Sequence, residues 1–328
     1  MIKRLFALVL ALLMCLALFA GCGSQPEPTQ PPTKLPAPPS VTQEQSKVTP
    51  LLYKVTDGDG NVAWLFGSIH IGTEDFYPLP DYVLDAFDGS DALAVEVDVL
   101  ALESDLGAQM QMLSQMVYTD GSTIKDHISE ELYESAVAIM EASGMYMQML
   151  DYYMPVIWYS YVESCAIMQC GYDANLGVDY HMLRRAKAQK KPVLEVESAQ
   201  EQYAMLAGLS PELQVYLLEN TVNSCKDIQV YLMAMSMLVG AWKNGNEEAL
   251  SANVNKTPIF FDEEERRLYE EFNQALLTQR DGGMTQFAVD ALSSGDEVFI
   301  CVGAAHVLGE EGMIYQLRQL GYTVERVD

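Results

Sequence analysis

Two short apolar runs, each ending in the pattern Gly-x-x-His, constrain the fold of this chain more than any other feature. The first leads into Gly67 and His70, and the second into Gly303 and His306. A short apolar run that stops at a glycine is typical of a buried strand in a parallel sheet, and such sheets present ligand-binding groups just beyond the carboxyl ends of their strands. Each histidine would then lie on the turn that leaves a strand, where two turns can converge on one site. Two unrelated strand ends are the alternative interpretation of so short a pattern.

The composition describes a folded, acidic protein. With 328 residues, of which 49% are hydrophobic and 9% aromatic, the chain can bury a substantial core. Its formal net charge is −27, and it has only 19 lysines and arginines. Because phosphate backbones recruit Lys and Arg, this charge argues against a nucleic-acid partner, and it also disfavours binding to an anionic membrane surface.

The N-terminus resembles a bacterial lipoprotein signal peptide. Lys3 and Arg4 precede an apolar run over 5–19 that is short for a membrane span, and Cys22 follows directly after Ala-Gly. This resemblance implies that residues 1–21 are removed and that Cys22 is lipidated. We therefore expect a protein anchored by lipid to the cell membrane, on its extracytoplasmic face. An ordinary secretory signal is the alternative, and it also places the protein outside the cytoplasm.

A tether follows the signal peptide. Eight of the fourteen prolines fall between residues 23 and 50, mixed with Gln, Ser, Thr and Glu. Such a segment buries too little apolar surface to fold, and its prolines keep it extended. We expect residues 22–50 to form the lipidated, proline-rich tether and residues 51–328 to form the folded domain.

The periodicity of apolar residues in the folded domain predicts an α/β fold. Short apolar runs bounded by turn residues predict strands near both ends, whereas apolar residues three and four apart predict helices over most of 100–250. We therefore predict one central mixed sheet built from two related halves. The first and last quarters of the chain supply the strands of these halves, and a large, mostly helical insertion separates them in the sequence. The predicted strands are 51–55, 62–70, 91–98, 193–197, 297–303 and 323–327, and the longest predicted helices are 102–116, 131–142, 145–170, 211–221, 227–242 and 262–277.

Carboxylates also follow the predicted strands. Alternation along one strand places Glu96 and Asp98 on the same face at its carboxyl end, and Glu197 ends another strand. Two imidazoles with one carboxylate and an open position suit a metal ion that activates water. His70, His306 and Glu96 are therefore candidate metal ligands, although a histidine at a strand end also commonly makes a backbone hydrogen bond. The chain has no H-E-x-x-H, G-x-S-x-G or P-loop motif.

Six short sequence blocks, spread along the folded domain, contain the strand-end motifs and the residues around them. They cover 65–72, 94–98, 177–179, 194–202, 279–281 and 302–309. Each block alone is a weak signal, but the ordered set resembles the successive blocks of the TraB/GumN family, which includes the TIKI metalloproteases. The resemblance extends over almost the whole folded domain.

This resemblance implies a fold shared with erythromycin esterase and the haem-binding ChaN proteins. It also implies a peptidase that depends on a divalent metal ion, with both Gly-x-x-His motifs and a glutamate in the active site. His70, His306 and Glu96 match those positions, and Gly67 and Gly303 are the motif glycines that support them. The identity of the metal ion is left open.

Other residues match the family with less definite roles. Arg280 matches the arginine before the last buried strand, where it could hold a substrate carboxylate, stabilise an oxyanion or form a salt bridge. Glu197 and Asp179 match positions whose side chains could support the ligands, cap a helix or bind metal themselves. The chain has Asp281 after Arg280, where asparagine is commoner in the family, so a role for an amide at that position is in doubt.

The sequence therefore predicts a membrane-anchored, extracytoplasmic, metal-dependent hydrolase, with a peptide or protein as substrate. Glu96 is either a metal ligand or the general base for a bound water, Arg280 is a second candidate catalytic residue, and Asp98 is a supporting carboxylate. The alternative is a non-catalytic lipoprotein of the same fold that binds haem or another ligand.

Overall fold

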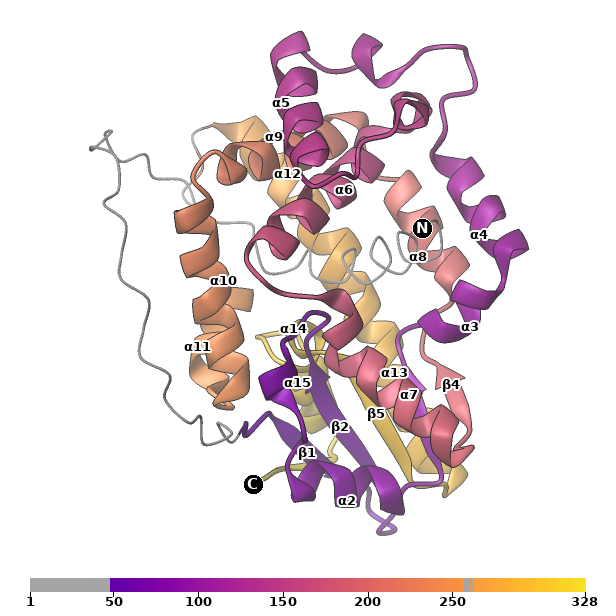
Figure 1. Ribbon diagram of the computed structural model, residues 1–328. Helices are drawn as coiled ribbons and strands as arrows, with labels where there is room; N and C mark the ends of the chain where they lie inside the picture. The colour runs from indigo at the N-terminus through magenta and orange to yellow at the C-terminus, as the bar shows by residue number, and fades with distance from the viewer. Residues whose placement is uncertain (1–47, 257–259, 261) are drawn as a thin grey trace.

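The structure is a computed structural model that describes residues 48–256, 260 and 262–328 (Figure 1). The predicted signal peptide, Cys22 and most of the predicted tether lie outside the described residues. Among the described residues, no helix combines the length and the apolar character needed to cross a membrane.

The centre of the molecule is a six-stranded mixed sheet with the order β4-β3-β5-β2-β1-β6. Strands β4, β3, β5 and β2 run parallel to one another, and β1 pairs in the antiparallel sense with both β2 and β6. The strands are β1 (Leu52–Thr56), β2 (Val62–Ser68), β3 (Ala92–Val95), β4 (Val193–Glu195), β5 (Val298–Gly303) and β6 (Thr323–Val327).

The sheet confirms the predicted α/β class and combines strands from both ends of the chain. The last-quarter strand β5 lies between β3 and β2 of the first quarter, so the two ends of the chain interleave in the sheet and do not form separate halves. β5 is buried over its whole length, as expected for an apolar strand in the middle of a sheet whose two faces are covered.

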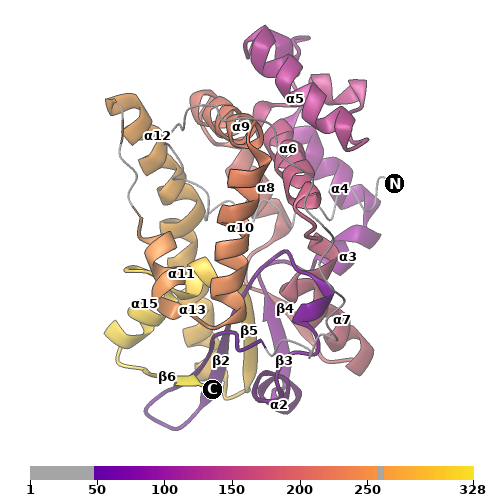
Figure 2. The ribbon, with the colours of Figure 1, turned by 60° about the vertical axis from the view of Figure 1, so that its left-hand side comes forward.

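Helices cover both faces of this sheet. Figures 1 and 2 show α7 (Val178–Gln189) on one side of the sheet and α13 (Gln279–Ser294) on the other. The remaining helices next to the sheet are α2 (Asp81–Gly89), α14 (Ala304–Val307) and α15 (Met313–Gln319).

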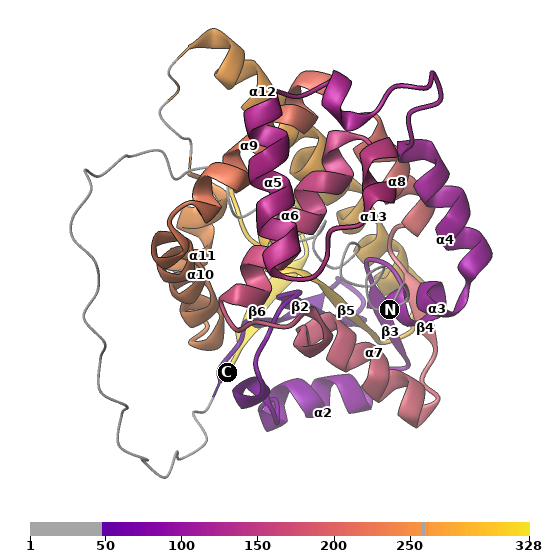
Figure 3. The same ribbon diagram turned by 45° about the horizontal axis from the view of Figure 1, so that its top comes forward.

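A helical layer continues from the carboxyl ends of the strands (Figure 3). Helix α3 (Val99–Ser104) follows β3 closely, and α8 (Ala199–Ala207) follows β4 in the same way. The rest of the layer consists of α4 (Leu106–Leu113), α5 (Glu130–Ala142), α6 (Pro155–Gln169), α9 (Pro211–Cys225), α10 (Ile228–Lys243), α11 (Glu247–Val254) and α12 (Glu263–Asn273).

Two local differences from the predicted elements have a clear cause. The helix predicted over 145–170 begins at Pro155, because proline has no N–H to donate and suits the first turn of a helix. The strand predicted over 91–98 ends at Val95, and Asp98 caps α3 by accepting a hydrogen bond from Ala101 N at 2.9 Å. The placement of Asp98 on the strand face beside Glu96 was therefore wrong.

Candidate functional site

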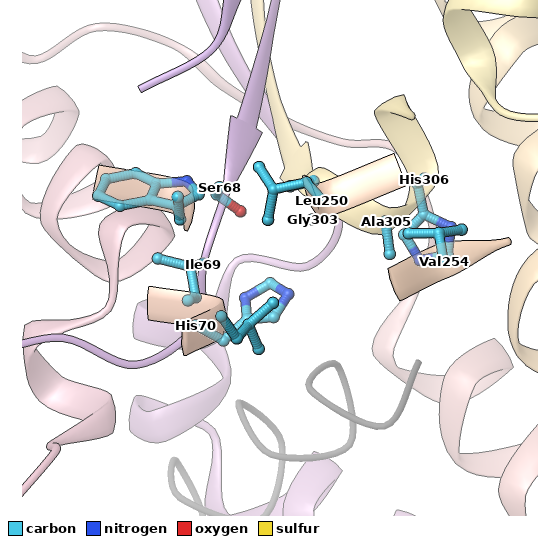
Figure 4. Close-up of a pocket in the computed structure, with 11 residues that line it drawn as sticks. Ser68, Ile69, His70, Leu250, Val254, Gly303, Ala305 and His306 are labelled. Atoms are coloured by element: carbon cyan, nitrogen blue, oxygen red, sulfur yellow. The ribbon is translucent and has the colours of Figure 1, made fainter. Parts of the chain in front are cut away.

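The two Gly-x-x-His motifs leave the sheet side by side. Strands β2 and β5 are parallel neighbours, and their register pairs Ser68 with Gly303 at the end of the ladder. The turns that follow carry His70 and His306, and both imidazoles are buried, with 4% and 3% of their surface exposed. Figure 4 shows the two histidines on opposite sides of one pocket. The convergence expected from the repeated motif therefore occurs.

Gly303 is the point around which the site side chains gather. A Cβ atom on Gly303 would lie 3.3 Å from His70 Nε2, 3.3 Å from Glu96 Oε1 and 3.7 Å from His306 Cδ2. The other motif glycine has the reciprocal role, because a Cβ on Gly67 would lie 3.2 Å from the backbone of Ala304. Each glycine thus leaves room for the opposite motif, and a side chain at either position would require its neighbours to shift by a few tenths of an ångström.

Glu96 follows β3 and is held at this point by three partners. Its Oε1 accepts a hydrogen bond from Gly303 N at 2.7 Å and lies 3.6 Å from His70 Nε2, while its Oε2 accepts from Arg280 Nη2 at 2.6 Å. Burial on its own raises the pKa of Glu96, but Arg280, His306 and His70 together with the Gly303 N–H outweigh it and lower that pKa to about 2. Glu96 is therefore a carboxylate at any physiological pH.

Arg280 joins Glu96 to a second carboxylate. Its Nε and Nη2 donate to Glu197 at 2.9 and 2.6 Å, and its Nη1 donates to Leu276 O at 3.3 Å. Glu197 reaches this position because the hydrogen bonding between β3 and β4 continues past both strands, with Glu197 N donating to Glu96 O at 3.0 Å. A π-helical turn, Gln274–Thr278, comes directly before α13 and precedes Arg280. Of the three roles predicted for Arg280, the structure contains the salt bridge. This salt bridge with Glu96 and Glu197 holds the Glu96 carboxylate in place.

An aspartate lies behind each histidine. His70 Nδ1 lies 2.9 Å from Asp179 Oδ1 in the first turn of α7, and His306 Nδ1 lies 2.6 Å from Asp281 Oδ1 in the first turn of α13. Burial on its own lowers the pKa of His70, but Asp179 and Glu96 raise it above its ordinary value. Because each Nδ1 faces a carboxylate, the Nε2 atoms are the ones available to a bound group.

The structure brings most of the predicted site residues together. His70, His306, Glu96, Arg280, Glu197, Asp179 and the two motif glycines form one connected cluster, whereas Asp98 serves as a helix cap. Sequence reasoning missed Asp281 as the partner of His306. The sequence carries no local signal for this pairing, because consecutive residues of a helix, such as Arg280 and Asp281, point in different directions.

The donor types in this cluster suit a divalent metal ion. Imidazole nitrogens and a carboxylate oxygen are ligands that zinc and related ions accept, and an aspartate behind an imidazole is the usual way to orient a histidine ligand. Within residues 48–256, 260 and 262–328, no group of three or more His, Cys, Asp or Glu side chains is already gathered tightly enough to hold an ion. An ion would have to share Glu96 with Gly303 N and Arg280.

The mixed sheet thus places two histidines and a clamped glutamate at the carboxyl ends of its strands, where open α/β sheets commonly bind ligands. The chain belongs to the TraB/PrgY/gumN family, whose model matches residues 51–326. It is 29% identical over 258 residues to YbaP of Escherichia coli (strain K12) and equally to YbaP of Shigella flexneri, covering 77% of this chain and 87% of each relative. Both relatives are described as uncharacterized proteins. No solved structure matched the chain.

Proposed function

We propose that this protein is a metal-dependent hydrolase, and that it cleaves peptide bonds. The observation that carries the proposal is the grouping around Gly303, where His70 Nε2 and Glu96 Oε1 both lie 3.3 Å from the place of a Cβ atom and His306 lies just beyond. Three potential donors from three separate segments meet at the carboxyl edge of the sheet, where open α/β sheets commonly bind their ligands.

His70, His306 and Glu96 would hold the ion, with the two histidines donating through Nε2. A divalent ion bound there would polarise a carbonyl group and lower the pKa of a water molecule near it. The protein's own contribution is orientation: Asp281 is hydrogen-bonded to His306 Nδ1, and Asp179 places a carboxylate charge 2.9 Å from His70 Nδ1. Glu96 would be the third ligand. Because Arg280 and its other partners lower its pKa to about 2, it accepts a proton poorly, and the general-base role predicted as the alternative is less favoured.

The surroundings of these groups favour chemistry away from bulk water. His70, Glu96 and His306 expose only 4%, 3% and 3% of their surfaces, and the Arg280 side chain only 10%. In such an environment a charge interacts more strongly with its neighbours than it does in water. The same burial makes each partner of the network costly to remove, because an unpaired buried charge is left behind.

The finer fold and the location of the protein belong to the same proposal. We expect the arrangement of the erythromycin esterase and ChaN proteins, and a lipid anchor at Cys22 that holds the domain at the extracytoplasmic face of the cell membrane. The support for the anchor is the apolar run before Cys22 and the proline-rich stretch that follows it.

Metal analysis combined with peptide cleavage tests the proposal. The protein is incubated with Zn²⁺, Mn²⁺ or Co²⁺, dialysed, and assayed for bound metal and for cleavage of a mixed peptide library with and without EDTA. We expect close to one ion per chain, cleavage that EDTA abolishes, and loss of both in His70→Ala and His306→Ala. The matched control is His127→Ala, because His127 is exposed and its ring stacks on Tyr118 outside the site.

Two results would contradict the proposal. A protein that retains no metal and cleaves no peptide is not this hydrolase, and cleavage that persists in EDTA excludes the metal. A haem titration followed by absorbance belongs in the same experiment, because tight haem binding without cleavage would favour a ligand-binding protein.

A further inference from the structure

We propose that the pocket beside the two histidines is a specificity pocket that receives an aliphatic side chain of the substrate. The inference rests on the proposed peptidase function and adds to it the class of residue recognised. The pocket opens between the ends of β2 and β5 and a wall formed by helices α10 and α11 (Figure 4). Its far wall consists of Leu238 and Trp242 from α10 and Leu250 and Val254 from α11.

The lining of this pocket is mostly apolar, and its polar groups are the two histidines and the Ser68 hydroxyl. Apart from His70 and His306, the described residues that line it are aliphatic or aromatic residues, alanines, Gly303 and Ser68, and none is Asp, Glu, Lys or Arg. The charged residues of the site, among them Glu96 and Arg280, do not contribute to the lining. A substrate group in the pocket would therefore touch an imidazole on one side and hydrocarbon on the other.

Trp242 fixes the wall relative to the histidines. Its Nε1–H donates to Gly67 O at 2.8 Å, and its ring stacks on Phe76 with centroids 5.1 Å apart and only 1% of the residue exposed. Gly67 is the glycine of the first Gly-x-x-His motif. The helical wall is thus bonded directly to β2, three residues before His70, and this bond sets the position of the wall relative to that histidine.

The chemistry of the lining selects the ligand. An aliphatic side chain gains free energy by leaving water for such a pocket, whereas a basic side chain would lose its hydration and find no carboxylate in the lining. A pocket of this kind discriminates against charge more strongly than against small differences in aliphatic size. The side chain recognised is therefore of the valine, leucine or methionine type.

Binding of two matched tripeptides tests the assignment without turnover. The probes are acetyl-Ala-Leu-Ala-amide and acetyl-Ala-Lys-Ala-amide, and their binding to the full protein is measured by ligand-observed NMR in EDTA. We expect the leucine peptide to bind at least about tenfold more tightly than the lysine peptide. Val254→Trp, which fills the pocket from a half-buried position, should remove most of this preference.

The control variant is Met237→Trp, since Met237 lies on α10 with 70% of its surface exposed and does not line the pocket. It should bind the leucine peptide as the unmodified protein does, and thermal melts of both variants check folding. Equal binding of the two peptides, or unchanged binding in a folded Val254→Trp protein, overturns the assignment. Selective binding of the leucine peptide without any cleavage would support the specificity pocket and refute the proposed hydrolase activity. Cleavage of peptides without a preference for aliphatic side chains would support the hydrolase activity and refute the specificity pocket.

Discussion

Glu163 makes the stability of the protein depend on pH between about 4.5 and 7. This carboxyl lies on α6 with 2% of its surface exposed, and Tyr231 donates to its Oε1 at 2.6 Å. Burial raises its pKa from 4.5 to about 7, although hydrogen bonds from Tyr231 and Thr221 act in the opposite direction. The folded state therefore retains this proton over a range in which the unfolded chain has already lost it.

The sign and the size of the effect follow from linkage. Because the folded protein binds more protons than the unfolded chain between these two pKa values, the free energy of unfolding falls as the pH rises through this interval. The stabilisation is complete below about pH 4.5 and is lost by a little above pH 7. At about 1.4 kcal/mol for each pKa unit, the loss amounts to roughly 3 kcal/mol, a large part of the stability of an ordinary domain.

Urea unfolding at a series of pH values measures this effect. Glu163→Gln keeps an oxygen that can accept from Tyr231 but cannot lose a proton, so it imitates the neutral acid. We expect the unmodified protein to lose about 2 kcal/mol relative to Glu163→Gln between pH 5 and pH 7.5, the part of the full effect that falls within this range. Glu134→Gln, which removes a charge from an exposed position on α5, should show no such trend. A constant difference between the Glu163→Gln protein and the unmodified protein over this range would refute the reasoning.

Three further predictions concern the site. Gly303→Val should keep the fold by circular dichroism but weaken metal binding at least about tenfold, because its side chain enters the space that the donors face; unchanged affinity would argue against Gly303 as the centre of the site. Arg280→Met should lower the free energy of urea unfolding by roughly 3–5 kcal/mol, because it leaves Glu96 buried without its cation; a loss below about 1 kcal/mol is the opposing result. Asp281→Ala should weaken metal binding by about 10- to 100-fold by releasing His306 Nδ1, and it should also lower the free energy of unfolding because both partners are buried; an unchanged affinity in the folded variant would show that Asp281 has no orienting role.

Much of the site could be predicted from sequence because its main parts lie at strand ends. The apolar runs before Gly67 and Gly303 predict buried parallel strands, and the carboxyl ends of such strands meet at one edge of a sheet. That geometric rule is enough to bring His70, His306 and Glu96 near one another. Local sequence patterns are sufficient for this prediction, since each of these three residues lies within a few positions of the end of its strand.

The remainder depends on contacts between distant parts of the chain. The position of β5 between β3 and β2 is set by packing of the whole sheet, and no local pattern encodes it. For the same reason the pairing of Asp281 with His306 and the bond from Trp242 to Gly67 could not be predicted. Asp98 was misplaced because alternation along a strand says nothing about where that strand ends.

The most direct test of the central proposal is X-ray absorption at the metal edge of the loaded protein, which counts the imidazole ligands of the bound ion. The account predicts two histidine nitrogens and at least one oxygen, and the loss of one imidazole in His306→Ala. A bound ion with no imidazole ligand, or one whose ligands are unchanged in both His70→Ala and His306→Ala, would contradict it.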